Sequence, residues 1–182
     1  MIDKTDRLWA GWRMAYIRES SETPDDGDEC LFCGLAAQKP SPENLILERY
    51  ENGLLVLNAF PYTTGHVMVA PYRHHDSILG EGDERAELLA AVDRARHALL
   101  LEYKAQGFNV GTNLGRVAGA GVLGHIHWHL VPRWKGDTNF VPAVAMTRVM
   151  PEALPDTYSR LLQALEQAPT NGLRIEGRGD GS

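Results

Sequence analysis

Residues 124–131 read GHIHWHLV, in which His125, His127 and His129 occupy alternate positions. In a β-strand successive side chains point to opposite faces, so this spacing predicts that the three imidazoles share one face of a sheet. The apolar residues between them then point the other way, into the core. Three imidazoles in a row on one face are hard to explain by packing alone, and clustered titratable groups indicate a functional site.

The segments on either side of these histidines predict a sheet and two helices. Helical periodicity predicts a long amphipathic helix over 83–104 and a C-terminal helix over 152–168. Strands joined by short turns, with one long helix between them, favour the α+β class with an antiparallel sheet of about five strands. The strands are expected, from runs of β-forming residues bounded by turn-like sequences, at 45–50, 53–60, 66–72, 108–114 and 125–134.

The chain divides into three parts by composition. Residues 1–29 form an N-terminal arm rich in aromatic residues, followed by a polar, acidic linker. Residues 30–168 carry all the predicted strands and helices and form one domain. Residues 169–182 are rich in glycine and poor in apolar residues, which is typical of a flexible tail.

Charge and hydropathy narrow the class of function. The chain of 182 residues has a formal net charge of -6, which argues against a broad electrostatic surface for nucleic acid. A small anionic ligand needs only a local group of donors, so nucleotides remain compatible with this charge. The sequence has no apolar run of membrane-spanning length and no signal-like N-terminus, so we expect a cytoplasmic protein that does not enter a membrane.

Two chemistries suit the alternating histidines. One is a zinc site formed by histidines of a single strand. The other is covalent catalysis, in which a neutral imidazole attacks phosphorus and its neighbours orient it and stabilise phosphate charge. The segment before the strand favours the second, because its glycines let backbone N–H groups approach anionic oxygens. The residues concerned are Asn113, Gly115, Gly119 and Gly121.

The sequence resembles the histidine-triad (HIT) family over about residues 30–135. The stretch HIHWHLV is similar to the family motif of three histidines separated by apolar residues. Asn58 stands eight residues before His66 in NAFPYTTGH, and the strand GHVMVAP (65–71), the tripeptide Asn113-Leu114-Gly115 and VPRW (131–134) also resemble family motifs. The N-terminal WAGWRMAYI and the stretch PRWKGDTNFVP (132–142) are similar to a bacterial branch that includes diadenosine tetraphosphate phosphorylases.

This resemblance implies a HIT-like catalytic domain and a role for each motif residue. His127 is implied to be the nucleophile that forms a nucleotidyl-histidine intermediate, with His125 as the first member of the triad. His129 and Asn113 would contact the α-phosphate. The loop glycines Gly119 and Gly121 are expected to bring backbone N–H groups to anionic oxygens of the nucleotide. The implied role of Asn58 is to bind the ribose, and that of His66 is to support the triad.

One departure from the family pattern concerns the acceptor. Family members usually have Gly-Gln-Ser or Gly-Gln-Thr just before the triad, whereas this sequence has Gly119-Ala120-Gly121-Val122. The missing Gln helps to position the leaving group and the incoming water. Its absence leaves room for inorganic phosphate as the acceptor in place of water.

The spacing Cys30-x-x-Cys33 predicts metal binding or redox chemistry in a reducing compartment. Many histidine-triad proteins carry a zinc ion held by such a pair and two histidines, of which one follows the Pro-x-x of the Gly-His strand and the other opens the triad. The resemblance therefore implies a structural zinc on Cys30, Cys33, His74 and His125, with His75 as the neighbouring alternative. No organic cofactor is expected.

The resemblance implies an enzyme that cleaves a nucleotide phosphoanhydride at the α-phosphate. Its expected substrate is an adenine nucleotide or dinucleotide such as diadenosine tetraphosphate (Ap4A), with phosphate or water as acceptor. The alternatives are an AMP-phosphoramidase, an adenylylsulfate-cleaving enzyme and a nucleotide-binding regulator without turnover. A zinc-only structural module would leave His127 and His129 without a role. Family members are typically two-fold dimers with a continuous sheet, which implies a homodimer.

Overall fold

The computed structural model describes residues 30–137 and 152–177, so the predicted N-terminal arm lies outside the described residues. One antiparallel sheet contains five strands in the order β1-β2-β3-β5-β4. The α+β prediction with about five antiparallel strands is therefore confirmed. The strands are β1 (Ile46–Arg49), β2 (Gly53–Leu57), β3 (Val67–Pro71), β4 (Gly107–Gly111) and β5 (Trp128–Arg133).

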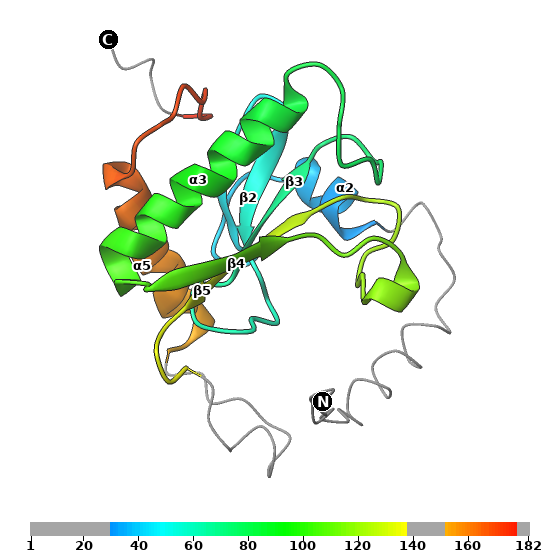
Figure 1. The fold of residues 1–182 in the computed structure, drawn as a ribbon. Coiled ribbons are helices and arrows are strands. Elements are labelled where there is room, and N and C mark those ends of the chain that lie inside the picture. The colour runs from blue at the N-terminus through cyan, green and yellow to red at the C-terminus, as the bar shows by residue number, and fades with distance from the viewer. Residues whose placement is uncertain (1–29, 138–151, 178–182) are drawn as a thin grey trace, which may run out of the picture.

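Helices cover the two faces of the sheet unequally. The long helix α3 (Glu84–Tyr103) lies across the sheet, and α5 (Leu154–Gln167) packs beside it on the same face (Figure 1). The main core lies between these helices and the sheet, where Leu57, Val69 and Leu99 are buried together. A smaller core on the opposite face contains Phe32 and Leu35 of the short helix α2 (Leu31–Ala36). No helix in the described part of the chain is long and apolar enough to span a membrane.

Strand β5 begins at Trp128, whereas the alternating pattern predicted a strand from His125. The difference arises because the chain before Trp128 makes other hydrogen bonds. The N–H of Ile126 donates to the His75 carbonyl at 2.6 Å, and the His125 carbonyl lies 2.9 Å from the ring Nδ1 of His127. The alternation of side chains nevertheless continues. The rings of His125 and His127 pack on Phe32, and His129 is the ladder partner of Met68 in the same smaller core.

The helical period over 83–104 predicted the long helix within one residue at each end but not all of its buried positions. Leu89, an apolar residue of this helix, is 46% exposed, while the charged Arg94 is fully buried. Arg94 makes a bidentate ion pair with Glu48 of β1, in which Nε and Nη2 each donate to a carboxylate oxygen at 2.7 Å. It also donates to the carbonyls of Leu165 and Ala168, which lie at the C-terminal end of α5. One buried cation therefore joins β1, α3 and α5.

The tail predicted from residue 169 packs on the body as far as the described chain extends. Ile175 is buried in the main core. The N–H of Glu176 donates to the Arg49 carbonyl at 3.0 Å, and its carboxylate pairs with the Arg49 guanidinium. Residues 178–182 lie outside the described residues.

Candidate active site and metal centre

His66 and His129 form the first part of the site, and their contacts determine where each ring carries its proton. The backbone N–H of Tyr62 donates to Nδ1 of His66 at 3.1 Å. In the neutral ring the proton must then lie on Nε2, which is 3.0 Å from Nδ1 of His129. His129 accepts this hydrogen bond, so its own proton lies on Nε2. His129 therefore offers an N–H donor on the side of its ring away from His66.

His127 has the opposite arrangement. Its Nδ1 lies 2.9 Å from the His125 carbonyl, and a carbonyl oxygen can only accept, so Nδ1 carries the proton. The lone pair of the neutral ring is then on Nε2. The rings of His127 and His129 meet edge to face with their centroids 5.0 Å apart. A ring with an unprotonated Nε2 therefore packs against a ring that carries an N–H donor.

Burial keeps these rings neutral. His127 is 4% exposed, and removal from water lowers its pKa. Burial, with a smaller contribution from the charge of His127, lowers the pKa of His129 to about 4. The lone pair of His127 is therefore available at neutral pH, as attack on phosphorus requires.

The four predicted metal ligands lie together. Their ligand atoms, from Cys30, Cys33, His74 and His125, are all within 4.8 Å of one another. The Nδ1 atom of His125 is 3.3 Å from Sγ of Cys30 and 3.6 Å from Sγ of Cys33, and Nδ1 of His74 is 3.4 Å from Sγ of Cys33. In a tetrahedral zinc site the usual bond lengths separate sulfur and nitrogen ligands by roughly 3.6 Å. The cluster therefore fits a zinc ion.

Hydrogen bonding around the cluster prepares His125 as a ligand. Its Nε2 lies 2.9 Å from the Pro71 carbonyl and must donate to it, which leaves Nδ1 free for a metal. His74 approaches the chain so closely at Gly124 that a Cβ there would be 3.0 Å from its Nε2. Gly124 also has a φ of 68°, which favours glycine.

His75, the neighbouring alternative to His74, has a different role. Its Nε2 lies 2.9 Å from a carboxylate oxygen of Glu84 at the start of α3. The same carboxylate accepts from Arg73 at 3.0 Å. These contacts anchor the turn around His74 on both sides, so the choice of His74 over His75 as metal ligand agrees with the structure.

The predicted ribose and phosphate residues surround the triad unequally. Asn58 lies next to His66, with its Nδ2 3.3 Å from the ring Nδ1, and its Oδ1 accepts from the Phe60 N–H. Asn113 follows β4, which ends at the ladder partner of His129, so the chain leaves the sheet beside the triad. Its side chain donates to the Gly119 carbonyl at 3.4 Å.

The glycine loop is a short 3₁₀ helix, η2 (Arg116–Ala118), with its turns closed by its own backbone. The N–H of Gly119, expected to face a phosphate, donates to the Arg116 carbonyl at 3.0 Å. Gly119 serves the turn through a left-handed conformation with φ 86°. Gly121 is exposed, and its N–H donates no hydrogen bond to an acceptor among the described residues.

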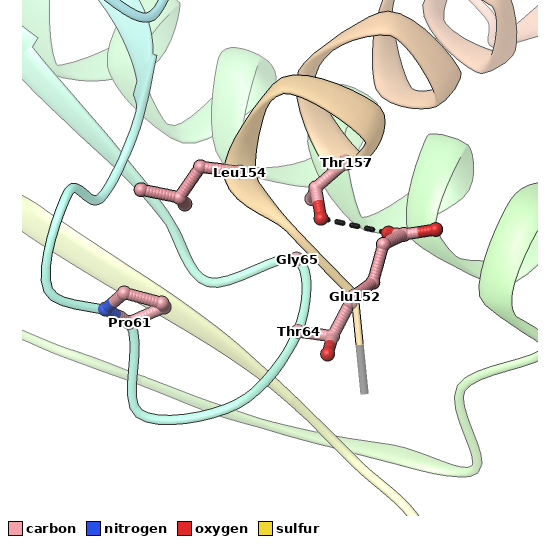
Figure 2. Close-up of a pocket in the computed structure, with 6 residues that line it drawn as sticks. All are labelled: Pro61, Thr64, Gly65, Glu152, Leu154 and Thr157. Carbon is pink, nitrogen blue, oxygen red and sulfur yellow. Dashed lines mark hydrogen bonds between the residues drawn. The ribbon is translucent and has the colours of Figure 1, made fainter. Parts of the chain in front are cut away.

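A cavity of about 210 Å³ lies behind the loop that carries Asn58 and His66, at the N-terminal end of α5 (Figure 2). Its wall includes Thr157, whose hydroxyl donates to Glu152 at 2.7 Å as Figure 2 shows. None of the three triad histidines lines it. The cavity is lined by Pro61, Thr64, Gly65, Glu152, Leu154 and Thr157.

Two aromatic residues of the site escaped sequence reasoning. The ring of Phe32 packs on His127 and His125, with centroid distances of 4.8 and 5.2 Å. The ring of Tyr62 packs on His66 at 4.7 Å and lies 6.1 Å from His129. Phe32 lies between Cys30 and Cys33, and Tyr62 lies in NAFPYTTGH, so their position within these motifs was the available signal.

The fold and the site define a class of protein in which three alternating histidines lie on a five-stranded antiparallel sheet, and comparison with known proteins agrees. The HIT domain family matches residues 38–136. A curated protein of Mycobacterium tuberculosis (strain H37Rv) named AP-4-A phosphorylase is 37% identical over 170 residues, which cover 91% of this chain and 86% of that protein. The chain belongs to the HIT family.

Solved structures support the same family. A Zn-bound histidine triad family protein from Mycobacterium smegmatis superimposes with a TM-score of 0.60 at 27% identity, covering 76% of this chain and 94% of that one. A hypothetical histidine triad nucleotide-binding protein from Sulfolobus tokodaii gives a TM-score of 0.61 at 26% identity, covering 76% and 93%.

Proposed function

We propose that this protein cleaves a phosphoanhydride of an adenine dinucleotide at the α-phosphorus, through a covalent adenylyl intermediate on His127. The observation that carries this proposal is the pair of opposite tautomers in the triad. His127 presents an unprotonated Nε2, and His129 beside it presents an N–H. This pairing suits attack on phosphorus with simultaneous stabilisation of phosphate charge.

The reaction consists of two displacements. Nε2 of His127 forms a bond to the α-phosphorus, and the bond from that phosphorus to the bridging oxygen breaks, so a nucleoside polyphosphate leaves with the electron pair. The acceptor then attacks the same phosphorus, and the P–N bond returns its electrons to the imidazole. His129 donates its Nε2–H to a non-bridging oxygen in both steps. Asn58 would bind the ribose, and Asn113 and Gly121 would approach the phosphates.

The relative named AP-4-A phosphorylase supports diadenosine tetraphosphate as the substrate and phosphate as the acceptor. The sequence around Ala120 supports the same acceptor, since the side chain that usually orients water in the family is absent there. The metal would hold α2 and the turn of His74 against the triad segment through Cys30, Cys33, His74 and His125, and it would supply structural stability rather than a chemical step.

A homodimer is the proposed assembly. Strand β4 forms one edge of the sheet among the described residues, and Val110 in this strand is 50% exposed. An open edge with apolar side chains is a template for pairing with another strand, and a second copy would continue the sheet across a two-fold axis. Light scattering would contradict this if it returned the monomer mass of 20.1 kDa at micromolar concentration.

Product analysis tests the proposed reaction. Purified protein is incubated with diadenosine tetraphosphate, with and without inorganic phosphate, and the nucleotides are separated by chromatography. ADP plus ATP only with phosphate supports phosphorolysis, whereas AMP plus ATP without phosphate indicates hydrolysis. Tight binding without turnover would replace the enzyme proposal by a nucleotide-binding regulator.

A further inference from the structure

Phe32 occupies an unusual place, because it stands between two proposed metal ligands and contacts the proposed nucleophile. It lies in the sequence CLFC on helix α2, flanked within two residues by Cys30 and Cys33. Its side chain is fully buried, and its ring lies 4.8 Å from the ring of His127 at an interplanar angle of 34°.

We infer that Phe32 is a positioning residue for His127, and that the metal centre sets the position of Phe32 through the cysteines on either side of it. The inference rests on the proposed function in so far as His127 is the nucleophile. It assigns a role to Phe32 that is separate from binding the nucleotide, since no part of its side chain is exposed.

The geometry shows why His127 needs such a support. Within residues 30–137 and 152–177, its ring has one polar contact, the hydrogen bond from Nδ1 to the carbonyl of His125 two residues earlier. Rotation of the imidazole about its bond to Cβ would break this bond and move Nε2 away from the site. The flat ring of Phe32 contacts one side of the imidazole, and the edge-to-face contact with His129 limits it further. Packing of this kind removes alternative ring orientations.

Helix α2 in turn depends on contacts outside itself. It has six residues, too few for a helix to be stable alone, and no side chain caps its N-terminus. Two sets of contacts hold it. Phe32 and Leu35 pack into the smaller core, and the cysteines approach the rings of His74 and His125. A metal bound to these four residues would fasten the first turn of α2, and hence Phe32, to the segment that carries His127.

The experiment compares two variants of the same helix. Phe32→Leu keeps an apolar side chain but removes the flat ring, and Leu35→Ala removes volume from the same core at the next turn of α2. We expect Phe32→Leu to lower kcat by about tenfold or more with KM changed less than about twofold. In ¹⁵N spectra of the histidine rings, the His127 signals should change from the Nδ1–H tautomer to a mixture. Leu35→Ala should keep the wild-type tautomer and kcat, even where its thermal unfolding temperature falls further.

A second measurement uses the wild-type protein before and after removal of metal by a chelator, under conditions where far-ultraviolet circular dichroism shows it to be folded. The His127 ring signals should shift toward the same mixture. Unchanged His127 signals in Phe32→Leu, or equal changes in Leu35→Ala, would overturn the role of Phe32. Unchanged signals after metal removal would overturn the link to the metal. Full activity of His127→Gly would instead remove the proposed function, while the ring spectra would still test the contact.

Discussion

The Nε2 atom of His66 lies 3.0 Å from Nδ1 of His129, so the residue immediately before β3 determines which nitrogen of the third triad histidine carries the proton. Replacing His66 with Phe keeps an aromatic ring but removes the donor. His129 could then place its proton on Nδ1 and lose its donor toward phosphate. We expect kcat to fall by roughly ten- to a hundredfold, with metal content unchanged. His66→Gln, whose amide can donate, should recover part of the loss. Equal kcat in His66→Phe and the wild type would contradict this tautomer assignment.

His127→Gly should abolish turnover by about three orders of magnitude or more while nucleotide binding remains, because it removes the bond-forming nitrogen. His129→Ala should be less severe, since it removes only stabilisation of charge. Single-turnover rates and mass spectrometry of acid-labile adducts after brief mixing with diadenosine tetraphosphate provide the measurement. An adduct on any residue other than His127 would rule out the mechanism.

Cys33→Ser should lose both metal and stability. The protein prepared without chelator should contain close to one zinc per chain, because the donors of the cluster suit a closed tetrahedral site. Loss of a thiolate weakens metal binding, and the free energy of binding that contributes to folding falls with it. Elemental analysis and thermal unfolding are the measurements. The control is His97→Ala, on the surface of α3, which should keep its metal. Wild-type protein that contains no metal when prepared in this way would contradict the proposed zinc site.

The burial of His129 predicts a pH dependence of stability. Its pKa is about 4 in the folded protein against an ordinary value of 6.5, so the unfolded chain takes up the proton first as pH falls. The stability associated with the neutral ring is fully present above pH 6.5 and is lost as pH falls from there toward about 4. Urea unfolding at pH 7 and pH 5 should therefore show a smaller loss for His129→Gln than for the wild type. An identical loss in both would show that His129 titrates normally.

The buried pair of Arg94 and Glu48 should dominate the stability of the main core. Arg94→Met removes the guanidinium that pairs with the buried Glu48 carboxylate, to which the Tyr50 hydroxyl also donates. It also frees carbonyls at the end of α5. Removing one partner of a buried ion pair costs about 3–5 kcal/mol. Urea unfolding measures the loss, and the double variant Arg94→Met with Glu48→Gln should recover part of it. A loss of less than about 1 kcal/mol would mean that water reaches the pair.

Local patterns in the sequence determined the class of fold and the identity of the triad. Runs of β-forming residues and a helical period of three to four residues are properties of short segments, so they predicted the five strands and both long helices without knowledge of how these pack. The family motifs are equally local, and they marked His127, His129 and Asn58 for the site. The pair Cys30 and Cys33 marked one half of the metal cluster.

Tertiary structure alone decided the contacts that join distant segments. Cys30 and His125 are 95 positions apart, and His66 and His129 are 63 apart, so the ring tautomers follow from packing and not from spacing. From its charge alone, Arg94 would be placed on the polar face of its helix. It is buried because the Glu48 carboxylate and carbonyls at the end of α5 accept its hydrogen bonds. Strand β5 starts at Trp128 because the Ile126 N–H donates to the His75 carbonyl and not to a neighbouring strand. The hydrogen-bond partner, protonation and burial of a side chain depend on the residues that the fold places against it. These residues come from distant segments, so one segment of sequence cannot predict them.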